Sequence, residues 1–399
     1  MNLVLDLCLL ALSIPVVYLS FLALAAIPTR RTMPRVEPTC RFAIAISAHD
    51  EEIVIGRTVA ALWRSDYPAK LFDLFVVADH CSDSTARVAR EAGALVFEKN
   101  ELPRGKGPAL RWLFRQILNC ESYDAVVIFD ADTRVAPDFL RIMDACLAQG
   151  HDIIQGQHRI LNPSDGWFPM LAWAMFLADN RLQNQGRSNL GLSAKNMGDS
   201  ICFRADILRR FGWGGGLTDD YAFRQRLLLE GFRIRYEPSA VGYGEAALDW
   251  RIARVQRARW LRGTYEADRR HAWHLLREAL HKGNLAALDG ALQACLPSYS
   301  TLTVLVLALA LANAFISRLG YAEFSQTWFV LLCVLAVYPF WGLALERAPL
   351  RAHIAMLSGP LFMIWRTWIA VTARYLHGKV EWVRTPRKDT IKPPALRSP

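Results

Sequence analysis

The chain has 399 residues, enough for one large domain with additional segments, and a mean hydropathy of +0.14, high for a soluble enzyme. Its eight cysteines form no Cys-x-x-Cys pair, so neither a disulfide framework nor a structural zinc site is expected. The net charge of +10 suits nucleic acid or anionic lipid. Because the basic residues cluster beside apolar segments, we favour membrane lipids as partners and expect no nucleic acid.

The chain opens with an apolar segment long enough to cross a bilayer. Residues Leu7 to Ile27 carry no charge, and a cluster of arginines begins at Arg30. A signal peptide is the alternative, since Ala23-Leu24-Ala25 resembles a cleavage site, but no basic region precedes the apolar run. We therefore predict a transmembrane anchor over residues 1–28, and the positive-inside rule puts the following domain in the cytosol.

Strand and helix signals alternate through the next part of the chain. Expected strands cover residues 42–47, 72–78, 94–97, 125–129 and 152–155. Expected helices cover residues 51–64, 84–92, 107–118 and 137–148. Such alternation is typical of the α/β class, with a mostly parallel sheet and helices on both of its faces. We predict one such domain over residues 39–250.

The strand at 125–129 runs into Asp130-Ala131-Asp132. At strand spacing, side chains two residues apart point to the same face, so we expect both carboxylates to converge beyond the strand's carboxyl end. Open α/β sheets bind ligands there. Two adjacent carboxylates repel each other unless a cation lies between them, and a hard divalent ion, Mg²⁺ or Mn²⁺, meets that need. A solvated turn is the alternative for this motif taken alone.

Polar residues also follow the first two expected strands, as Ala48-His49-Asp50-Glu51 and at Asp79. Because parallel strands share their carboxyl-end face, we expect these residues to lie beside Asp130. An acidic edge of this kind suits a bound metal, or hydrogen bonds accepted from a base and a ribose. Helix capping is the alternative for each cluster alone.

A glycine turn, Arg104-Gly105-Lys106-Gly107, precedes the expected helix at 107–118. Exposed amides and two cations suit a phosphate at a helix N-terminus. The spacing of a P-loop is absent, however, and a plain glycine turn accounts for the motif equally well.

A glycine-rich loop leads into Thr218-Asp219-Asp220 at the start of another helix. We expect Thr218 to cap this helix and both acids to lie in its first turn, where the helix dipole favours negative charge. Capping accounts for one acid and leaves the other for chemistry. Two adjacent like charges also tend to raise one pKa, which suits a general base.

Residues 251–296 contain a basic, tryptophan-bearing helix, which fits an element lying on the membrane face. Two further apolar segments, 297–316 and 327–345, are long enough to span a bilayer. A third, 354–376, carries Arg366, and we interpret it as an interfacial or re-entrant segment. The predicted C-terminal membrane region and the basic tail after it therefore cover residues 297–376 and 377–399.

The order and spacing of these motifs over residues 42–265 resemble membrane-embedded glycosyltransferases of family 2. This GT-A group includes cellulose, chitin-oligosaccharide, hyaluronan and poly-N-acetylglucosamine synthases, and ceramide glucosyltransferases have a similar plan. The resemblance implies inverting, Mg²⁺- or Mn²⁺-dependent transfer of a sugar from a nucleotide donor, expected to be a UDP-sugar. It also implies a multi-pass protein of the cell (inner or plasma) membrane with a cytosolic catalytic domain.

The resemblance assigns roles to individual positions. Those on the donor side are Ala48, Asp50, Glu51, Asp79, Lys106 and Asp130. The metal ligands are Asp130 and Asp132, and the general base is Asp220. The acceptor and lid positions are Asn196, Asp199, Gln256, Arg259 and Trp260, of which the last three form a Gln-x-x-Arg-Trp motif. Two departures matter: Thr-Asp-Asp replaces the family's Thr-Glu-Asp, and His49 stands where many relatives have Asn.

The motifs are compatible with two kinds of acceptor. A growing polysaccharide is the first interpretation, and a single addition to a lipid is the alternative. A non-catalytic scaffold that keeps the fold would tolerate loss of Asp130, Asp132 or Asp220, and all three residues are present.

Overall fold

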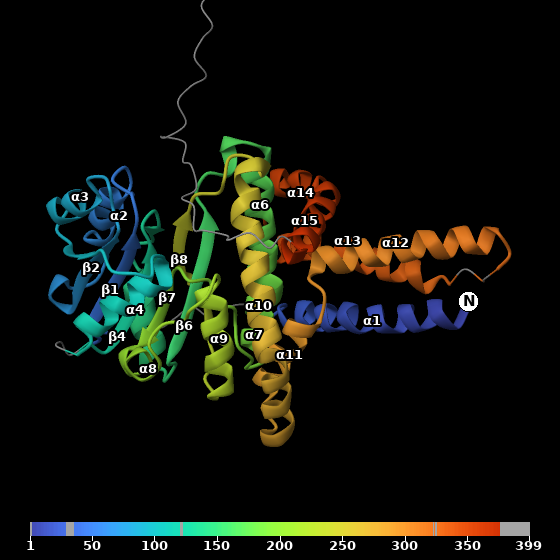
Figure 1. The fold of residues 1–399 in the computed structure, drawn as a ribbon, viewed down its shortest axis with the longest axis horizontal. Coiled ribbons are helices and arrows are strands. Elements are labelled where there is room, and N and C mark those ends of the chain that lie inside the picture. Colours follow the sequence, from blue (N-terminus) through green and yellow to red (C-terminus); the bar gives the residue numbers. More distant parts are fainter. Residues whose placement is uncertain (1, 29–35, 120–122, 322, 324, 376–399) are drawn as a thin grey trace, which may run out of the picture.

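A computed structural model describes residues 2–28, 36–119, 123–321, 323 and 325–375. It consists of a sheet domain, a set of long helices beside it, and an arm of apolar helices that projects from them (Figure 1). The sheet domain lies at one end and holds the strands whose ends form the candidate site.

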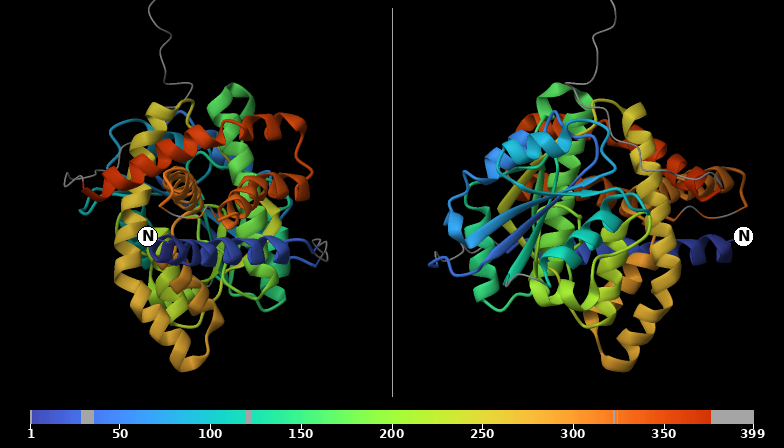
Figure 2. Two further views of the ribbon diagram at one scale, coloured as in Figure 1. Left: turned by 90° about the vertical axis from the view of Figure 1, so that its right-hand side faces the viewer. Right: turned by 60° about the vertical axis from the view of Figure 1, so that its left-hand side comes forward.

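One eight-stranded sheet has the order β3-β2-β1-β4-β7-β6-β8-β5 and is visibly twisted (Figure 2). Its strands are β1 Phe42–Ala48, β2 Phe72–Asp79, β3 Leu95–Lys99, β4 Ala125–Asp130, β5 Arg134–Val135, β6 Ile153–Ile160, β7 Ile201–Arg204 and β8 Arg235–Gly244. The first four are parallel, as is the β6–β8 pair, whereas β7 is antiparallel to both of its neighbours. The predicted α/β class with a mostly parallel sheet is confirmed.

Helices cover both faces of the sheet because the central strands are apolar on both sides. On β1, Phe42, Ile44 and Ile46 pack toward α2, α3 and α5, whereas Ala43 and Ala45 pack toward α4, α8 and α9. This alternation follows the two-residue period of a strand. The helices on the first face are α2 Ile55–Leu62, α3 Thr85–Glu91 and α5 Phe139–Ala148. Those on the second are α4 Lys106–Ile117, α8 Ala205–Phe211 and α9 Asp219–Leu229.

Helix α2 begins at Ile55, four residues later than the predicted start at residue 51. The intervening residues are held in a loop: the Asp50 carboxylate accepts a hydrogen bond from the Ser82 amide at 2.6 Å. The amide of the buried Glu51 donates to the Thr85 hydroxyl at 2.7 Å. Because these groups bind the neighbouring β2–α3 loop, the interpretation that residues 50–52 stabilise the first turn of α2 is wrong.

The remaining helices connect the sheet domain to the arm. They are α6 Trp167–Asp179, α7 Gly186–Asn189, α10 Trp250–Lys282, α11 Leu285–Cys295, α14 Leu350–Met356 and α15 Gly359–Tyr375. Short 3₁₀ turns cover Ala69–Leu71 and Pro163–Asp165, and a π-helical segment covers Asn180–Gln185. Helix α10 contacts α9, α11 and α15, so it lies between the sheet domain and the helices at the base of the arm.

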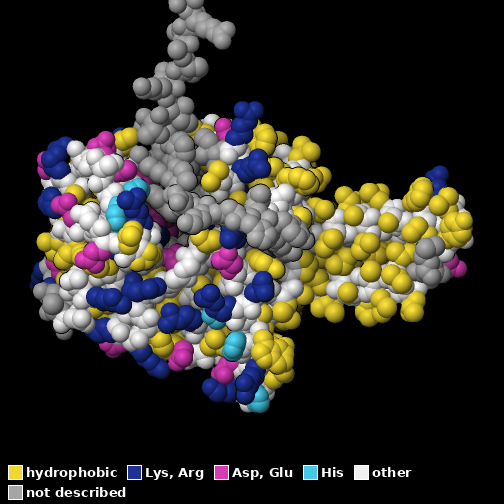
Figure 3. Space-filling model, in the orientation of Figure 1, with side chains coloured by type: hydrophobic (Ala, Val, Ile, Leu, Met, Phe, Trp, Pro, Cys, Tyr) yellow, Lys and Arg dark blue, Asp and Glu magenta, His cyan; other side chains and the backbone are white. Residues whose placement is uncertain are grey.

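Three described helices are long and apolar enough to cross a membrane, namely α1 Asn2–Ala25, α12 Tyr299–Arg318 and α13 Thr327–Leu345. They form the arm, whose surface is covered by apolar side chains (Figure 3). Helices α14 and α15 meet at a 50° bend and lie at the base of the arm (Figure 1). This geometry fits a broken span or a re-entrant segment, so the interfacial or re-entrant assignment stays a prediction.

A buried polar cluster joins α1 to the sheet domain. Arg187 of α7 binds both carboxylate oxygens of Asp289 on α11, at 3.0 and 3.1 Å. The Tyr18 hydroxyl of α1 donates to the same carboxylate at 2.5 Å and accepts from Arg187 at 2.8 Å. Arg224 of α9 lies 3.6 Å from Asp289. One carboxylate therefore links the first apolar helix with three helices of the rest of the protein.

Substitution of Gly156 by Ala tests the packing of β6 against β8. A Cβ at this position would lie 2.6 Å from the Ala240 carbonyl oxygen and 2.9 Å from that of Ser200, which are backbone atoms. We expect Gly156→Ala to lower the free energy of unfolding by about 1–3 kcal/mol, read as a lower thermal midpoint of the detergent-solubilised protein. Gly166→Ala is the control, because its nearest neighbour would be 3.6 Å away. Equal midpoints for the two variants would contradict this packing.

Candidate active site

The carboxyl ends of β1, β2 and β4 lie side by side, as predicted. In register, Ser47 pairs with Asp130 and Ala48 with Ala78. Strand β4 ends at Asp130, however, and Asp132 lies in the turn that follows. The strand-spacing argument is therefore wrong for Asp132, and it is the turn that brings the second carboxylate back toward the first.

The environment of Asp130 is rich in negative charge. Burial raises the pKa of its carboxyl group, the Lys106 ammonium opposes that effect, and the charges of Asp199 and Asp132 raise the pKa further. A divalent cation would relieve this repulsion, and carboxylate oxygens are the ligands that Mg²⁺ and Mn²⁺ prefer. Asp130 and Asp132 thus fit the metal that the sequence predicts.

Asp199 supports this turn from behind. Its Oδ1 accepts hydrogen bonds from the Asp130 amide at 3.0 Å and the Thr133 hydroxyl at 2.8 Å, on the two sides of Asp132. Its Oδ2 is 2.8 Å from His158 Nδ1 and accepts from the Ser200 hydroxyl at 3.1 Å. Burial raises the pKa of Asp199, but the hydrogen bond from His158 outweighs this effect and lowers the pKa to about 2. Both carboxylate oxygens of the buried Asp199 are therefore engaged within the protein.

His158, on β6, was not among the residues expected from the sequence. Its ring packs so closely against the backbone that a Cβ on Gly244 would lie 2.5 Å from Cε1. The Asp199 carboxylate raises the pKa of His158 against the effect of burial. Nothing in the local sequence marked His158, because its partner Asp199 lies 41 residues away.

Lys106 is the first residue of α4 and reaches across the site. Its ammonium donates to the Asp130 carboxylate and, at 2.5 Å, to the Gly198 carbonyl. The preceding Gly105 amide donates to Asp79 at 2.7 Å. The start of this helix thus contacts carboxylates of β2 and β4, and the phosphate contact expected there stays a prediction.

Asp79, at the end of β2, is 3% exposed and fully hydrogen-bonded. Besides Gly105, it contacts the Lys99 ammonium at 3.1 Å and the His80 ring at 2.8 Å. It therefore fixes the loop before α4 against β2 and β3. Its role in binding the donor stays a prediction.

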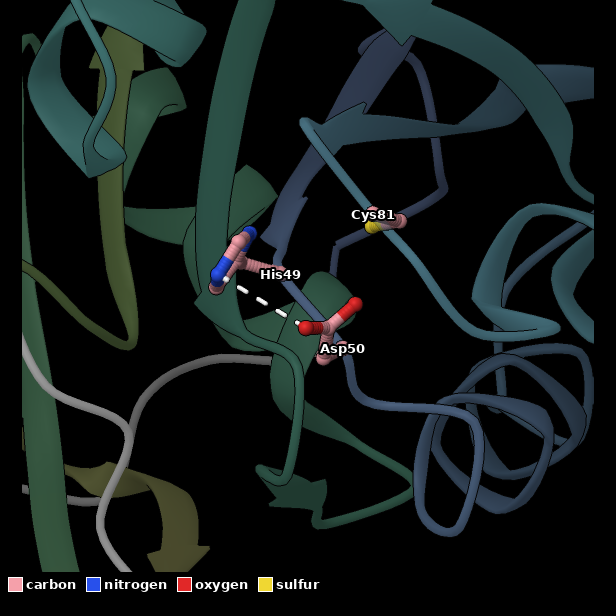
Figure 4. A group of neighbouring side chains, drawn as sticks. All are labelled: His49, Asp50 and Cys81. Carbon is pink, nitrogen blue, oxygen red and sulfur yellow. Dashed lines mark ion pairs between the residues drawn. The ribbon is translucent and has the colours of Figure 1, made fainter.

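The β1–α2 loop forms another wall of the site, where His49, Asp50 and Cys81 bring three candidate metal ligands within 4.8 Å of one another (Figure 4). The Asp50 carboxylate is already bound by Ser82, which lowers its pKa although burial opposes the shift. Burial raises the pKa of Cys81 to about 11, so its thiol stays neutral, and its sulfur lies 3.5 Å from the Ala48 carbonyl. A neutral thiol and an engaged carboxylate fit a divalent metal less well than the Asp130 turn.

The two acids at the start of α9 have different surroundings. The Asp219 carboxylate accepts a hydrogen bond from the Trp213 indole at 2.5 Å and packs on Gly107, where a Cβ would lie 2.6 Å away. It is therefore held in place. Asp220 has no such side-chain partner within the described residues; its Oδ1 accepts from the Tyr221 amide at 2.8 Å.

Asp220 faces the acceptor segment predicted at 196–200. A Cβ on Gly198 would lie 3.0 Å from Asp220 Oδ2, so these two residues are in contact. Burial, followed by the charge of Asp219, raises the pKa of Asp220 to about 7. The neighbouring Asn196 accepts from the Gly198 amide at 2.9 Å, while its buried Nδ2 has no hydrogen-bond partner in the part of the chain that the structure describes.

Helix α10 brings the Gln-x-x-Arg-Trp motif beside these acids. Burial lowers the pKa of Arg259, whereas Asp219 and Asp220 raise it, so its guanidinium lies within electrostatic range of both. Thr218 occupies the N-cap position of α9 but makes no capping hydrogen bond, which corrects that expectation. A Cβ on Gly263 would lie 2.7 Å from the Thr218 hydroxyl. Gln256 is half-buried, and Trp260 is 38% exposed.

The role of Asp199 can be tested through metal affinity. Asp199→Ala removes the acceptor that holds both sides of the Asp130–Asp132 turn, so we expect Mn²⁺ to bind about 10–100-fold more weakly. Electron paramagnetic resonance of free Mn²⁺ measures this without an activity assay. Thr133→Ser keeps the hydroxyl and serves as the control. Unchanged affinity in Asp199→Ala would show that the turn holds its shape without this contact.

Comparisons with known proteins agree with this fold. Residues 38–263, more than half of the chain, match the family model described as glycosyltransferase-like family 2. The poly-beta-1,6-N-acetyl-D-glucosamine synthase of Staphylococcus epidermidis is 26% identical over 58% of this chain and 56% of its own length. The beta-monoglucosyldiacylglycerol synthase of Trichormus variabilis is 27% identical over 56% and 48%, respectively. The chain thus spans about half the length of these two relatives.

Among solved structures, a mannosyltransferase from Pyrobaculum calidifontis in complex with GDP-Man and Mn²⁺ superimposes with a TM-score of 0.60. It covers 94% of this chain and 100% of its own, at 16% identity, which shows a shared fold. Together with the family match, this likeness extends from the sheet domain into the apolar helices. The chain belongs to glycosyltransferase family 2.

Proposed function

We propose that this protein is an inverting, metal-dependent glycosyltransferase that transfers a sugar from a nucleotide donor, with a UDP-sugar as the expected donor. The observation that carries the proposal is Asp220: a buried carboxyl group with a pKa of about 7, beside a second acid that the protein holds in place. A general base is most effective when its pKa lies near the working pH.

Asp220 would take the proton from an acceptor hydroxyl as that oxygen attacks the anomeric carbon. The new carbon–oxygen bond forms while the bond to the donor diphosphate breaks, and this single displacement inverts the configuration. Gly198 has no side chain and so contacts Asp220 closely, and the Asn196 amide beside it, which has no hydrogen-bond partner among the described residues, offers a hydrogen bond to the incoming acceptor.

The departing diphosphate needs positive charge on the opposite side. Lys106, at the start of α4, and Arg259 of α10 both lie within electrostatic range of Asp130 and supply it. A divalent cation held by Asp130 and Asp132 would further stabilise the charge that develops on the diphosphate. Asp199 and Thr133 keep those two carboxylates in position. The exposed Trp260 indole offers an apolar surface to a sugar ring.

We further propose a multi-pass protein of the cell (inner or plasma) membrane with a cytosolic catalytic domain. Its support is the three candidate spans and the arginines that follow α1 in the sequence. The named products of the relatives include both a polysaccharide and a glycolipid, so a growing polysaccharide and a single lipid acceptor both remain candidates.

Incubation of membranes with labelled nucleotide sugars and Mg²⁺ or Mn²⁺ tests the activity. We expect one donor to give labelled product, and Asp220→Asn to lower its kcat about 10²–10⁴-fold while nucleotide diphosphate still binds, because the base is lost. Sorting the product by size and lipid extractability separates a polymer from a glycolipid. Full transfer by Asp220→Asn would exclude this base, and a folded protein inactive with every donor would favour a scaffold.

The pH dependence of kcat provides a second test. Asp220 must be ionised to accept a proton, so activity should fall as the pH decreases through about 7, where the group becomes protonated. Asp219→Asn removes a charge that raises this pKa, and we expect the acid limb to move down by about one pH unit, equivalent to roughly 1.4 kcal/mol. A limb that does not move would show that the limiting proton belongs to another group.

A further inference from the structure

Where the sheet domain joins the apolar helices, Arg366 lies within electrostatic range of two other basic side chains, Arg257 and Lys195. Lys195 precedes the acceptor segment, Arg257 lies on α10 and Arg366 on α15, and these two helices are in contact. Lys195 is paired: its ammonium binds both oxygens of Asp179, at 2.8 and 2.9 Å. Within the described residues, neither arginine forms an ion pair with a carboxylate. The group therefore carries more positive than negative charge.

The charge of Arg257 lies in apolar surroundings. Its guanidinium stacks on apolar rings, 4.8 Å from the centroid of Phe362 and 5.9 Å from that of Phe168. Its Nε is buried and has no hydrogen-bond partner among the described residues. Burial, followed by the charge of Arg366, lowers the pKa of Arg257 to about 10. A half-buried charge held against apolar rings in this way is costly unless an anion approaches it.

Arg366 is fixed so that it faces the same region. Its Nη1 donates to the hydroxyls of Ser298 and Ser300, each at 3.1 Å, at the start of α12. Phe362, which contacts Arg257, lies one helical turn earlier on α15. Burial lowers the pKa of Lys195, and the charge of Arg366 also lowers it. Two guanidinium groups provide the donor geometry that suits a phosphate.

The outer side of α15 is apolar. Leu361, Ile364 and Trp368 are 76%, 57% and 64% exposed, and all three lie within two turns of Arg366. A ligand at this place would therefore meet cations on its inner side and lipid-facing side chains on its outer side. That combination matches a phosphate carried on a hydrocarbon chain better than a free phosphate ion.

The reaction centre is close by. Lys195 and Gly198 are three residues apart, so their Cα atoms are at most about 11 Å from each other, and Gly198 touches Asp220. We propose that Arg257, Arg366 and Lys195 bind the phosphate of a lipid-linked acceptor, which holds the acceptor's reacting group near Asp220. The acceptor role rests on the proposed function, whereas binding of the lipid phosphate does not.

Native mass spectrometry of the full chain in detergent can test the binding. The probes are phosphatidic acid, diacylglycerol with the same acyl chains, and inorganic phosphate. We expect phosphatidic acid to bind, diacylglycerol to bind at least 10-fold more weakly, and inorganic phosphate not to displace the lipid at equal concentration. Equal binding of the first two would overturn the proposal, and displacement by inorganic phosphate would overturn its lipid part.

Variants assign the binding to these residues. Arg257→Gln and Arg366→Gln should each weaken phosphatidic acid binding at least 10-fold, whereas Arg257→Lys should weaken it less because the charge remains. Arg254→Gln changes an exposed arginine of the same helix and should have no effect. Binding of a nucleotide diphosphate with Mn²⁺ verifies that each variant is folded. Equal losses in Arg254→Gln and Arg257→Gln would show unspecific attraction to a basic surface and overturn the assignment.

Steady-state kinetics connects lipid binding with sugar transfer. With a sugar linked through a phosphate to a long hydrocarbon chain as acceptor, which carries both the phosphate and a free hydroxyl, Arg366→Gln should raise the KM for the lipid about 10-fold and leave the KM for the donor unchanged. An unchanged lipid KM would overturn the acceptor role. If no variant or wild-type protein transfers any sugar while phosphatidic acid binding depends on the arginines, the proposed function fails and the lipid phosphate site stands.

Discussion

The site depends on one contact, in which the Lys106 ammonium binds both the Asp130 carboxylate and the Gly198 carbonyl. Burial would lower the pKa of Lys106, but Asp130, and then Asp219 and Asp199, raise it, so the ammonium stays charged. This cation joins β4, which ends at Asp130, to Gly198, which contacts Asp220. Without it, several carboxylates would repel one another across a small volume.

The same concentration of charge gives the two acids at the start of α9 different surroundings. Trp213 and Gly107 hold Asp219, and its fixed negative charge then raises the pKa of the adjacent Asp220. Among the described residues, only Asp219 of this pair accepts a side-chain hydrogen bond, so two adjacent aspartates have different surroundings. The short middle residue of Thr-Asp-Asp still reaches the indole.

Much of the sheet followed from the sequence because its central strands are buried on both faces and read as continuous apolar runs, as in 125–129. Strands β5, β7 and β8 were missed: β5 has two residues, β7 has four, and β8 contains Pro238 and several polar side chains. Such strands form only because their neighbours offer hydrogen bonds. Their pairing is a property of the assembled fold rather than of the local pattern.

The family resemblance identified positions in the site, but it did not indicate which contacts their side chains make. Asp199 was expected at the acceptor, yet its carboxylate lies behind the metal turn, and its partner His158 comes from a strand distant in sequence. Arg257 stands at a variable position inside the Gln-x-x-Arg-Trp motif, where nothing in the pattern marks it. Its significance arises from Phe362 and Arg366, which reach it from a helix about a hundred residues later.

The cluster of Tyr18, Arg187 and Asp289 has a consequence for the position of α9. Asp289 also lies near Arg224 on α9, the helix that begins with Asp219 and Asp220, so the first apolar helix is coupled to the helix that carries the proposed base. Polar contacts thereby fix α1 relative to α9. A shortened protein without α1 would lose the Tyr18 hydroxyl and leave a buried ion pair incompletely bonded, at a cost of about 1–3 kcal/mol. Removing α1, a candidate membrane span, would therefore disturb α9 as well.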